Sequence, residues 1–88
     1  MNYSVRLTPA AQKQIRKLDP PVARRIRTFL EDTLNGIDNP RVLGKPLIES
    51  DFWRYRVGDY RLLVSIEDHE LLILLVAVAH RREVYRDL

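Results

Sequence analysis

The stretch from Phe52 to Arg61 alternates apolar and basic side chains in a pattern that is typical of a β-hairpin. Its centre, Gly58-Asp59, suits a two-residue loop of type II′. With this loop, antiparallel pairing sets Arg56 opposite Arg61, and alternation along the strand places Arg54 on the same face. The other face is expected to be the core face, with Trp53, Tyr55, Val57, Leu62, Val64 and Ile66.

Three arginines on one face of a hairpin indicate an anion-binding site. Like charges that stand opposite each other destabilise a sheet, so such a cluster needs a reason to exist. Planar guanidinium groups with five donors suit phosphate. The alternative is that Arg54 and Arg56 are ordinary exposed strand residues that alternate with a buried face.

The first half of the chain predicts one strand and two helices. Residues 2–7 alternate with a period of two, which indicates an opening strand. Thr8-Pro9 and Asp19-Pro20 each combine an N-cap residue with proline at the first helical position. The second helix should end at Asn35-Gly36, with Gly36 in the left-handed conformation. The apolar residues at helical spacing are Ala11, Ile15, Leu18, Val22, Ile26, Phe29, Leu30 and Leu34.

The second half predicts a loop, the hairpin and a further strand. Residues 37–47 have no clear period and are rich in proline and glycine, so we expect a surface loop. The second hairpin strand should run from Tyr60 to Glu67, followed by a tight turn at Asp68-His69. Residues 71–79 are apolar without alternation, as expected for an interior strand that is buried on both faces. Residues 80–88 are charged and form either a helical turn or an extended tail.

This order of elements predicts a single α+β domain over residues 1–88. Two N-terminal helices should pack on one face of a mostly antiparallel, four-stranded sheet, with a short C-terminal tail or helix. The other face is left comparatively bare, and it is the face that carries the hairpin arginines. The tail leaves the interior strand at His80, so Arg81 and Tyr85 are expected beside the same surface, sharing one side if the tail is helical.

The amino-acid composition excludes several classes of site and of protein. The 88 residues include no cysteine and two histidines, which rules out a disulfide framework or thiolate site and argues against zinc. No cofactor is expected. The N-terminus lacks the apolar core of a signal peptide, and the apolar run at residues 71–79 is too short for a membrane helix. We therefore expect a cytoplasmic protein.

The basic residues are concentrated in the helical region. The net charge is +3, and six basic residues but a single acid lie between Gln12 and Leu30. This is either a solvated helix face or a surface that binds nucleic acid, in which case binding would depend steeply on salt. The residues concerned are Lys13, Arg16, Lys17, Arg24, Arg25 and Arg27.

The chain resembles the RelE branch of the RelE/ParE superfamily of bacterial toxins. The segments that carry the resemblance are LGKPL at residues 43–47, WRYRVGDYRLLVSI at 53–66 and AHRREVY at 79–85. The resemblance covers nearly the whole chain and implies a RelE-like fold. It also implies an endoribonuclease that enters the ribosomal A site and cuts messenger RNA. In the reaction so implied, the 2′-hydroxyl of the message attacks the adjacent phosphate, and the products carry a cyclic phosphate and a 5′-hydroxyl.

The same resemblance implies the catalytic residues. The family's functional positions match Arg54, Arg56, Arg61, Arg81 and Tyr85. Attack on a phosphodiester concentrates negative charge on the non-bridging oxygens, which preorganised guanidinium groups would stabilise. Tyr85 could accept a proton or stack on a base. Further RNA contacts are expected from Lys45, His80, Arg82, Lys13, Arg16, Lys17 and Arg24.

The sequence departs from the best-known members at two positions, where Arg54 and Arg56 replace lysines. Arginine holds its proton too tightly to be an ordinary base, so a general base at either position is in doubt, although phosphate binding is not affected. Histidine is the side chain best suited to carry protons near neutral pH, so His80 is either a proton carrier or a structural histidine at a strand end. The identity of the general base therefore stays open.

The resemblance also implies partners and alternatives. A RelB-like antitoxin should fold over the basic face and meet its arginines with acidic residues. The other implied partners are the ribosome, its RNA and the message, with no membrane. A ParE-like toxin, which shares the fold but binds and poisons DNA gyrase, is the main alternative, and a non-toxic RNA-binding module is the second.

Overall fold

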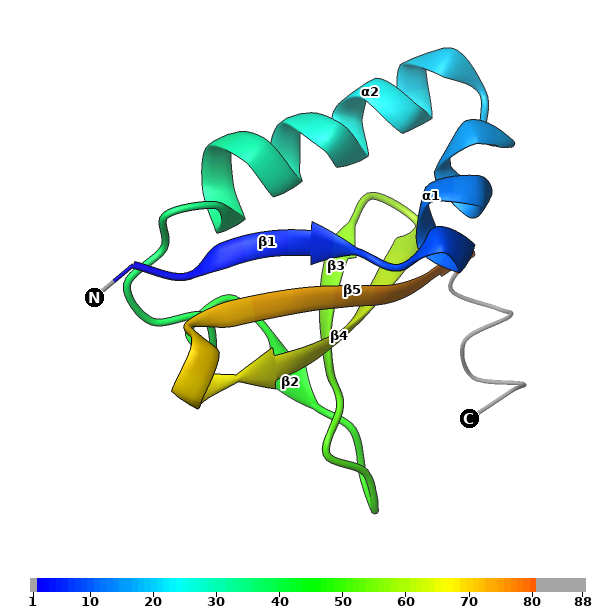
Figure 1. The fold of residues 1–88 in the computed structure, drawn as a ribbon. Coiled ribbons are helices and arrows are strands. Elements are labelled where there is room, and N and C mark those ends of the chain that lie inside the picture. The colour runs from blue at the N-terminus through cyan, green and yellow to red at the C-terminus, as the bar shows by residue number, and fades with distance from the viewer. Residues whose placement is uncertain (1, 81–88) are drawn as a thin grey trace.

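The computed structural model describes residues 2–80, and in this part of the chain two helices lie on one face of a five-stranded sheet (Figure 1). The strand order is β1-β5-β4-β3-β2, with β1 parallel to β5 and every other pair antiparallel. The predicted α+β architecture is confirmed. The helices are α1 (Pro9–Arg16) and α2 (Pro20–Thr28), and the strands are β1 (Ser4–Leu7), β2 (Lys45–Pro46), β3 (Trp53–Val57), β4 (Tyr60–Glu67) and β5 (Leu72–His80).

The sheet has five strands where the sequence predicted four. The additional strand is β2, which lies inside the segment expected to be a loop and pairs Lys45 with Arg54 and Pro46 with Trp53. Two residues are too few to show a period of two, and proline is tolerated on an edge strand.

Both helices begin where the capping residues predicted. The Thr8 hydroxyl accepts a hydrogen bond from the Ala11 amide at 3.1 Å, whereas Asp19 is the N-cap of α2 without a side-chain bond. After α2 the chain continues as a π-helical segment, Phe29–Leu34, in which the Asn35 amide donates to the Leu30 carbonyl at 2.9 Å. Gly36 then adopts a φ of +90°, the left-handed conformation that was expected there.

The predicted hairpin register is confirmed. Arg56 stands opposite Arg61, and Tyr55 stands opposite Leu62. Gly58 has a φ of +59°, and Asp59 is not among the non-glycine residues with positive φ, as a type II′ turn requires.

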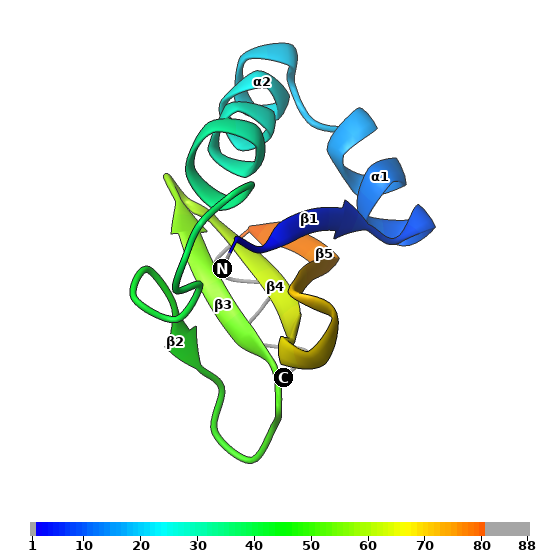
Figure 2. The same cartoon turned by 60° about the vertical axis from the view of Figure 1, so that its left-hand side comes forward.

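Strand β5 is interior, as predicted, but the expectation that it is buried on both faces is wrong. Only three of its residues, Ile73, Leu75 and Val78, are fully buried, and the residues between them are half-buried. The reason is visible in Figure 2, where both helices cover the same side of the sheet. The apolar run at residues 71–79 therefore correctly indicated an interior strand, but it did not mean that helices cover both faces of the sheet.

A β-bulge interrupts the pairing of β4 with β5. Leu63 pairs with Ala77 and Val64 pairs with Leu75, which leaves Val76 without a partner residue on β4. The Val76 carbonyl accepts a hydrogen bond from the Thr8 hydroxyl at 3.1 Å, and the Val78 amide donates to the Gln14 side chain at 2.7 Å. Helix α1 and its N-cap thus make hydrogen bonds to backbone groups of β5 at and beside the bulge.

The core lies between the helices and the covered face of the sheet. The predicted core positions Leu18, Val22 and Phe29 lie at its edge and are partly buried. Within residues 2–80, no helix is long and apolar enough to cross a membrane. The buried apolar residues are Ala11, Ile15, Ala23, Ile26, Leu30, Leu34, Tyr55, Val57, Leu62, Val64, Ile73, Leu75 and Val78.

Candidate phosphate-binding site on the open face of the sheet

Cationic side chains from three adjacent strands meet in one pocket on the sheet face that the helices leave uncovered. The pocket has a volume of about 250 Å³. Arg54 and Arg56 come from β3, Arg61 from β4 and Lys45 from β2, where it stands directly opposite Arg54. Leu43 and Tyr55 complete the lining.

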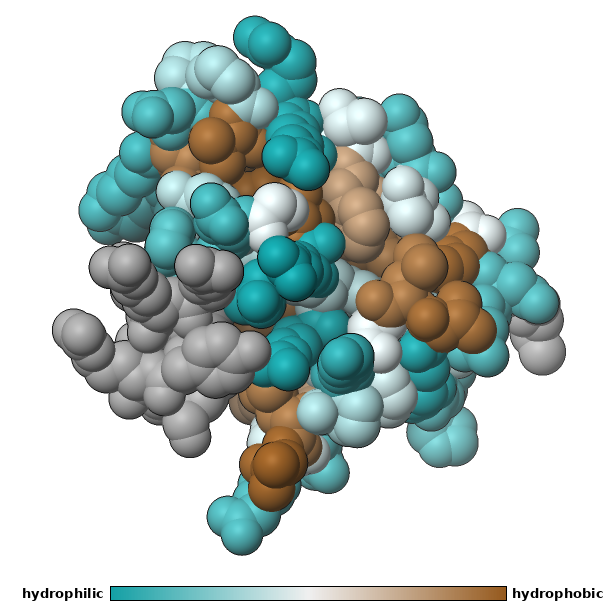
Figure 3. Space-filling model, turned by 180° about the vertical axis from the view of Figure 1, so that it is seen from behind, coloured by the Kyte–Doolittle hydropathy of each residue, from teal (hydrophilic) through white to brown (hydrophobic). Residues whose placement is uncertain are grey.

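The molecule seen from behind shows how polar and apolar surface are divided. Hydrophilic side chains occupy the middle of the view in Figure 3, and apolar side chains form groups above it, at the right and at the lower edge. The lower group lies on the projecting loop between β2 and β3, which carries Ile48. Together with Val42 and Leu43, Ile48 is one of the most exposed large apolar residues of the described chain.

The arginines of the pocket differ in burial. Arg61 is only 8% exposed, and its Nη1 donates one long hydrogen bond of 3.4 Å to the Tyr60 carbonyl. Arg56 is exposed, and its Nε donates to the Gly58 carbonyl at 3.3 Å. Within residues 2–80, no carboxylate forms a salt bridge with Arg56 or Arg61. Their positive charge is therefore available to an anion from outside the chain.

Tyr55 lies under the pocket, with its fully buried ring in the core beside Phe29. Its hydroxyl donates a hydrogen bond of 2.6 Å to the buried Pro40 carbonyl, and burial raises the pKa of Tyr55 to about 12. Gly44 allows the preceding loop to approach, because a Cβ there would lie 2.9 Å from the Arg54 carbonyl oxygen and 3.0 Å from the Tyr55 ring. The close approach at Gly44 holds its neighbour Lys45 beside β3.

A polar cluster that the sequence did not reveal holds the loop before β2 at Arg41, three residues before Gly44. Arg41 makes two hydrogen bonds of 3.0 Å to the Asp68 carboxylate, and the Tyr3 hydroxyl donates to that carboxylate at 2.7 Å. The Arg41 guanidinium also lies 5.6 Å from the centre of the Trp53 ring. The hydrogen bonds from Arg41 and Tyr3 lower the pKa of Asp68. No local pattern could have indicated this cluster, because its members are far apart in sequence.

His80 does not line the pocket. It stands opposite Tyr60 at the end of β5, and the two rings meet edge to face with their centres 5.5 Å apart. Tyr60 alternates with Arg61 along β4, so its side chain points to the other face of the sheet. The placement of His80 therefore fits the structural alternative better than a role in proton transfer.

The basic helix residues are exposed, but on the side of the sheet away from the pocket (Figures 1 and 2). They are the predicted RNA contacts Lys13, Arg16, Lys17 and Arg24. Arg25 lies against the hairpin turn, since a Cβ at Gly58 would be 3.1 Å from its Nη1. Arg81, Arg82 and Tyr85, which were also predicted to act at the site, lie outside the described residues.

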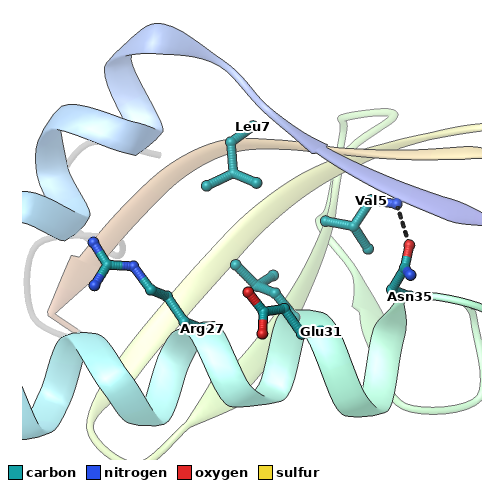
Figure 4. Close-up of a pocket in the computed structure, with 6 residues that line it drawn as sticks. Val5, Leu7, Arg27, Glu31 and Asn35 are labelled. Carbon is teal, nitrogen blue, oxygen red and sulfur yellow. Dashed lines mark hydrogen bonds between the residues drawn. The ribbon is translucent and has the colours of Figure 1, made fainter.

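A second hollow, of about 370 Å³, separates β1 from α2 and the π-helical segment. Figure 4 shows Val5 and Leu7 on one side and Arg27 and Glu31 on the other, with the Asn35 side chain accepting a hydrogen bond from the Val5 amide at 3.2 Å. Arg27 and Glu31 are the charged residues of this lining, and their charges cancel, so the hollow does not suit a phosphate. Within residues 2–80 there is also no group of three or more side chains that could hold a metal ion.

Comparisons with known proteins agree on one family. The family model described as ParE toxin of the type II toxin–antitoxin system parDE matches residues 5–85. Toxin RelG of Mycobacterium tuberculosis is 33% identical over 88 residues, covering 98% of this chain and 99% of the relative. Toxin RelE of the same organism is 30% identical over 86 residues, covering 96% and 87%. In the crystal structure of the RelBE2 toxin–antitoxin complex from that organism, a chain superposes with a TM-score of 0.83 at 31% identity, covering 92% of this chain and 100% of that one.

The fold, the basic pocket and these similarities define a toxin of the RelE/ParE superfamily. The chain belongs to the ParE toxin family of type II toxin–antitoxin systems, and the relatives described above carry RelE-type names. The recognition made from the three sequence segments is thus confirmed.

Proposed function

We propose that this toxin is a ribosome-dependent endoribonuclease that cuts messenger RNA in the ribosomal A site. The observation that carries the proposal is the meeting of Lys45, Arg54, Arg56 and Arg61 in one pocket on the open face. A protein that only bound a partner surface would not need a guanidinium as buried as that of Arg61 with so little internal compensation.

The pocket suits the transition state of phosphodiester cleavage. As the 2′-hydroxyl oxygen attacks phosphorus, negative charge grows on the two non-bridging oxygens. Arg61 is held by the hairpin before substrate arrives, so it can stabilise that charge without reorganisation. Arg54 and Arg56 bind the phosphates of the strand, and Arg81 and Tyr85 of the tail complete the site as the resemblance implies.

The partners proposed for the toxin follow from the same surface. The RelBE2 neighbour was crystallised as a toxin–antitoxin complex, which supports a RelB-like antitoxin for this chain. We expect its acidic residues to meet the basic pocket. The exposed cations Lys13, Lys17 and Arg24 are proposed to contact ribosomal RNA from the helical side, which would place the toxin in the cytoplasm.

Primer extension on a defined message, held in programmed ribosomes with an empty A site, tests the proposal. The wild type should cut within the A-site codon, and Arg56→Ala and Arg81→Ala should each slow cleavage about a hundredfold. Arg6→Gln, which removes one exposed charge on β1 outside the pocket lining, should cut like the wild type. A folded wild type that arrests growth but makes no cut would refute the nuclease.

The family match gives a second candidate. The matching model is described as ParE, and in the superfamily ParE-like toxins poison DNA gyrase without chemistry of their own. Under that alternative, growth arrest would coincide with broken DNA and intact messages, and gyrase cleavage assays would respond to the purified toxin.

A further inference from the structure

The described lining of the pocket contains few groups that could accept the proton of an attacking 2′-hydroxyl. Three of its side chains are arginines, which keep their protons under all conditions in which proteins work. Leu43 has no polar atom. Tyr55 donates its hydroxyl proton to the Pro40 carbonyl at 2.6 Å, and its pKa of about 12 keeps it protonated.

Lys45 is the remaining polar group, and its position suits the task. It stands opposite Arg54 on the neighbouring strand, so its side chain leaves the sheet on the same face as the three arginines. The close approach of Gly44 to the Arg54 carbonyl fixes the backbone of β2 there. An amine gives up its proton far more readily than a guanidinium, which is why proteins use lysine and not arginine as a base.

We propose that Lys45 is the catalytic base of the cleavage reaction, an inference that rests on the nuclease function proposed above. The neutral amine of Lys45 takes the proton of the 2′-hydroxyl while the O2′–P bond forms. The P–O5′ bond breaks, its electron pair leaves with the 5′-oxygen, and that oxygen takes a proton from water. The Lys45 ammonium then returns its proton to the hydroxide so formed, and the enzyme is restored.

Lys45→Arg separates a base from a simple phosphate contact, because arginine keeps the positive charge but cannot accept a proton. Single-turnover cleavage by this variant on programmed ribosomes should fall at least about a hundredfold, while its affinity for the ribosome stays within a few-fold of the wild type. The matched control is the reverse exchange Arg6→Lys on β1, outside the pocket lining, which should cut at the wild-type rate. Cleavage by Lys45→Arg within a few-fold of the wild type would overturn the inference.

A chemical replacement gives an independent readout. The chain contains no cysteine, so Lys45→Cys can be alkylated at that one position with 2-bromoethylamine to restore an amine of lower pKa than lysine. If Lys45 is the base, alkylation should restore cleavage and move the rise of rate with pH to lower pH. Restored cleavage with an unchanged pH profile would mean that the amine acts only as a cation and would overturn the assignment.

The same experiments distinguish the two levels of the proposal. Absence of cuts by the wild-type toxin refutes the nuclease function, and the role of Lys45 falls with it. Cuts by the wild type that persist undiminished in Lys45→Arg leave the nuclease intact and remove only Lys45 as its base.

Discussion

Arg61 combines burial with a charge that no carboxylate of residues 2–80 neutralises. Arg61→Lys keeps the charge but replaces a planar donor set by a point charge, and Arg61→Ala removes both. We expect single-turnover cleavage to fall by roughly a hundredfold or more in Arg61→Ala and by less in Arg61→Lys. Thermal unfolding of each variant provides the control, because a rate loss that merely tracked lost folded protein would contradict a direct role.

Tyr55 makes the stability of the protein sensitive to alkaline pH. Its pKa of about 12 in the folded state lies above the ordinary value of 10.0. Because the unfolded chain loses this proton first, stability is constant below about pH 10 and falls by on the order of 2 kcal/mol as the pH rises to about 12. Urea unfolding at several pH values should show this fall, and Tyr55→Phe should reduce it. An equally steep fall in Tyr55→Phe would contradict the assignment.

At the scale of elements, the cluster of Tyr3, Arg41 and Asp68 ties three separate segments together. The lowered pKa of Asp68 means that its contribution to stability is present above the ordinary carboxylate pKa of 3.8 and is lost as the pH falls through the lower, folded-state pKa. Asp68→Asn should therefore unfold with less dependence on pH below about 4 than the wild type. The same acid dependence in both proteins would show that other carboxylates are responsible.

The hairpin and the helix starts could be predicted because their determinants are local. Gly58 sets the turn and Thr8 caps a helix within a few residues of itself. The backbone at and beside the bulge is bonded by Thr8 and Gln14, more than sixty positions away, and the face on which Lys45 lies is set by a strand too short to show a period. The arginines of the pocket and Lys45 as a further RNA contact were thus predicted from the sequence, but the short strand that sets Lys45 opposite Arg54 and the burial of Arg61 were not.

At the scale of the whole molecule, two basic surfaces lie on opposite sides of one sheet. The pocket arginines project from the open face, while Lys13, Lys17 and Arg24 are exposed on the helices that cover the other face. Under the proposed function, the scissile phosphate binds the first surface, whereas a large RNA partner reaches both. The two surfaces should therefore affect different steps of the reaction.

Removing cations from the helices should weaken ribosome binding without slowing cleavage once the toxin is bound. In a variant with Lys13→Gln, Lys17→Gln and Arg24→Gln, the slope of log affinity against log salt should decrease by roughly one for each lost phosphate contact. Single-turnover cleavage at saturating toxin should stay at the wild-type rate, since these residues do not line the pocket. Arg56→Ala should instead slow cleavage and lower the salt slope by only about one, because it removes a single phosphate contact. If the triple variant instead bound ribosomes with the wild-type salt dependence, the basic helix face would be only a solvated surface, because counterions are released only where cations contact phosphates.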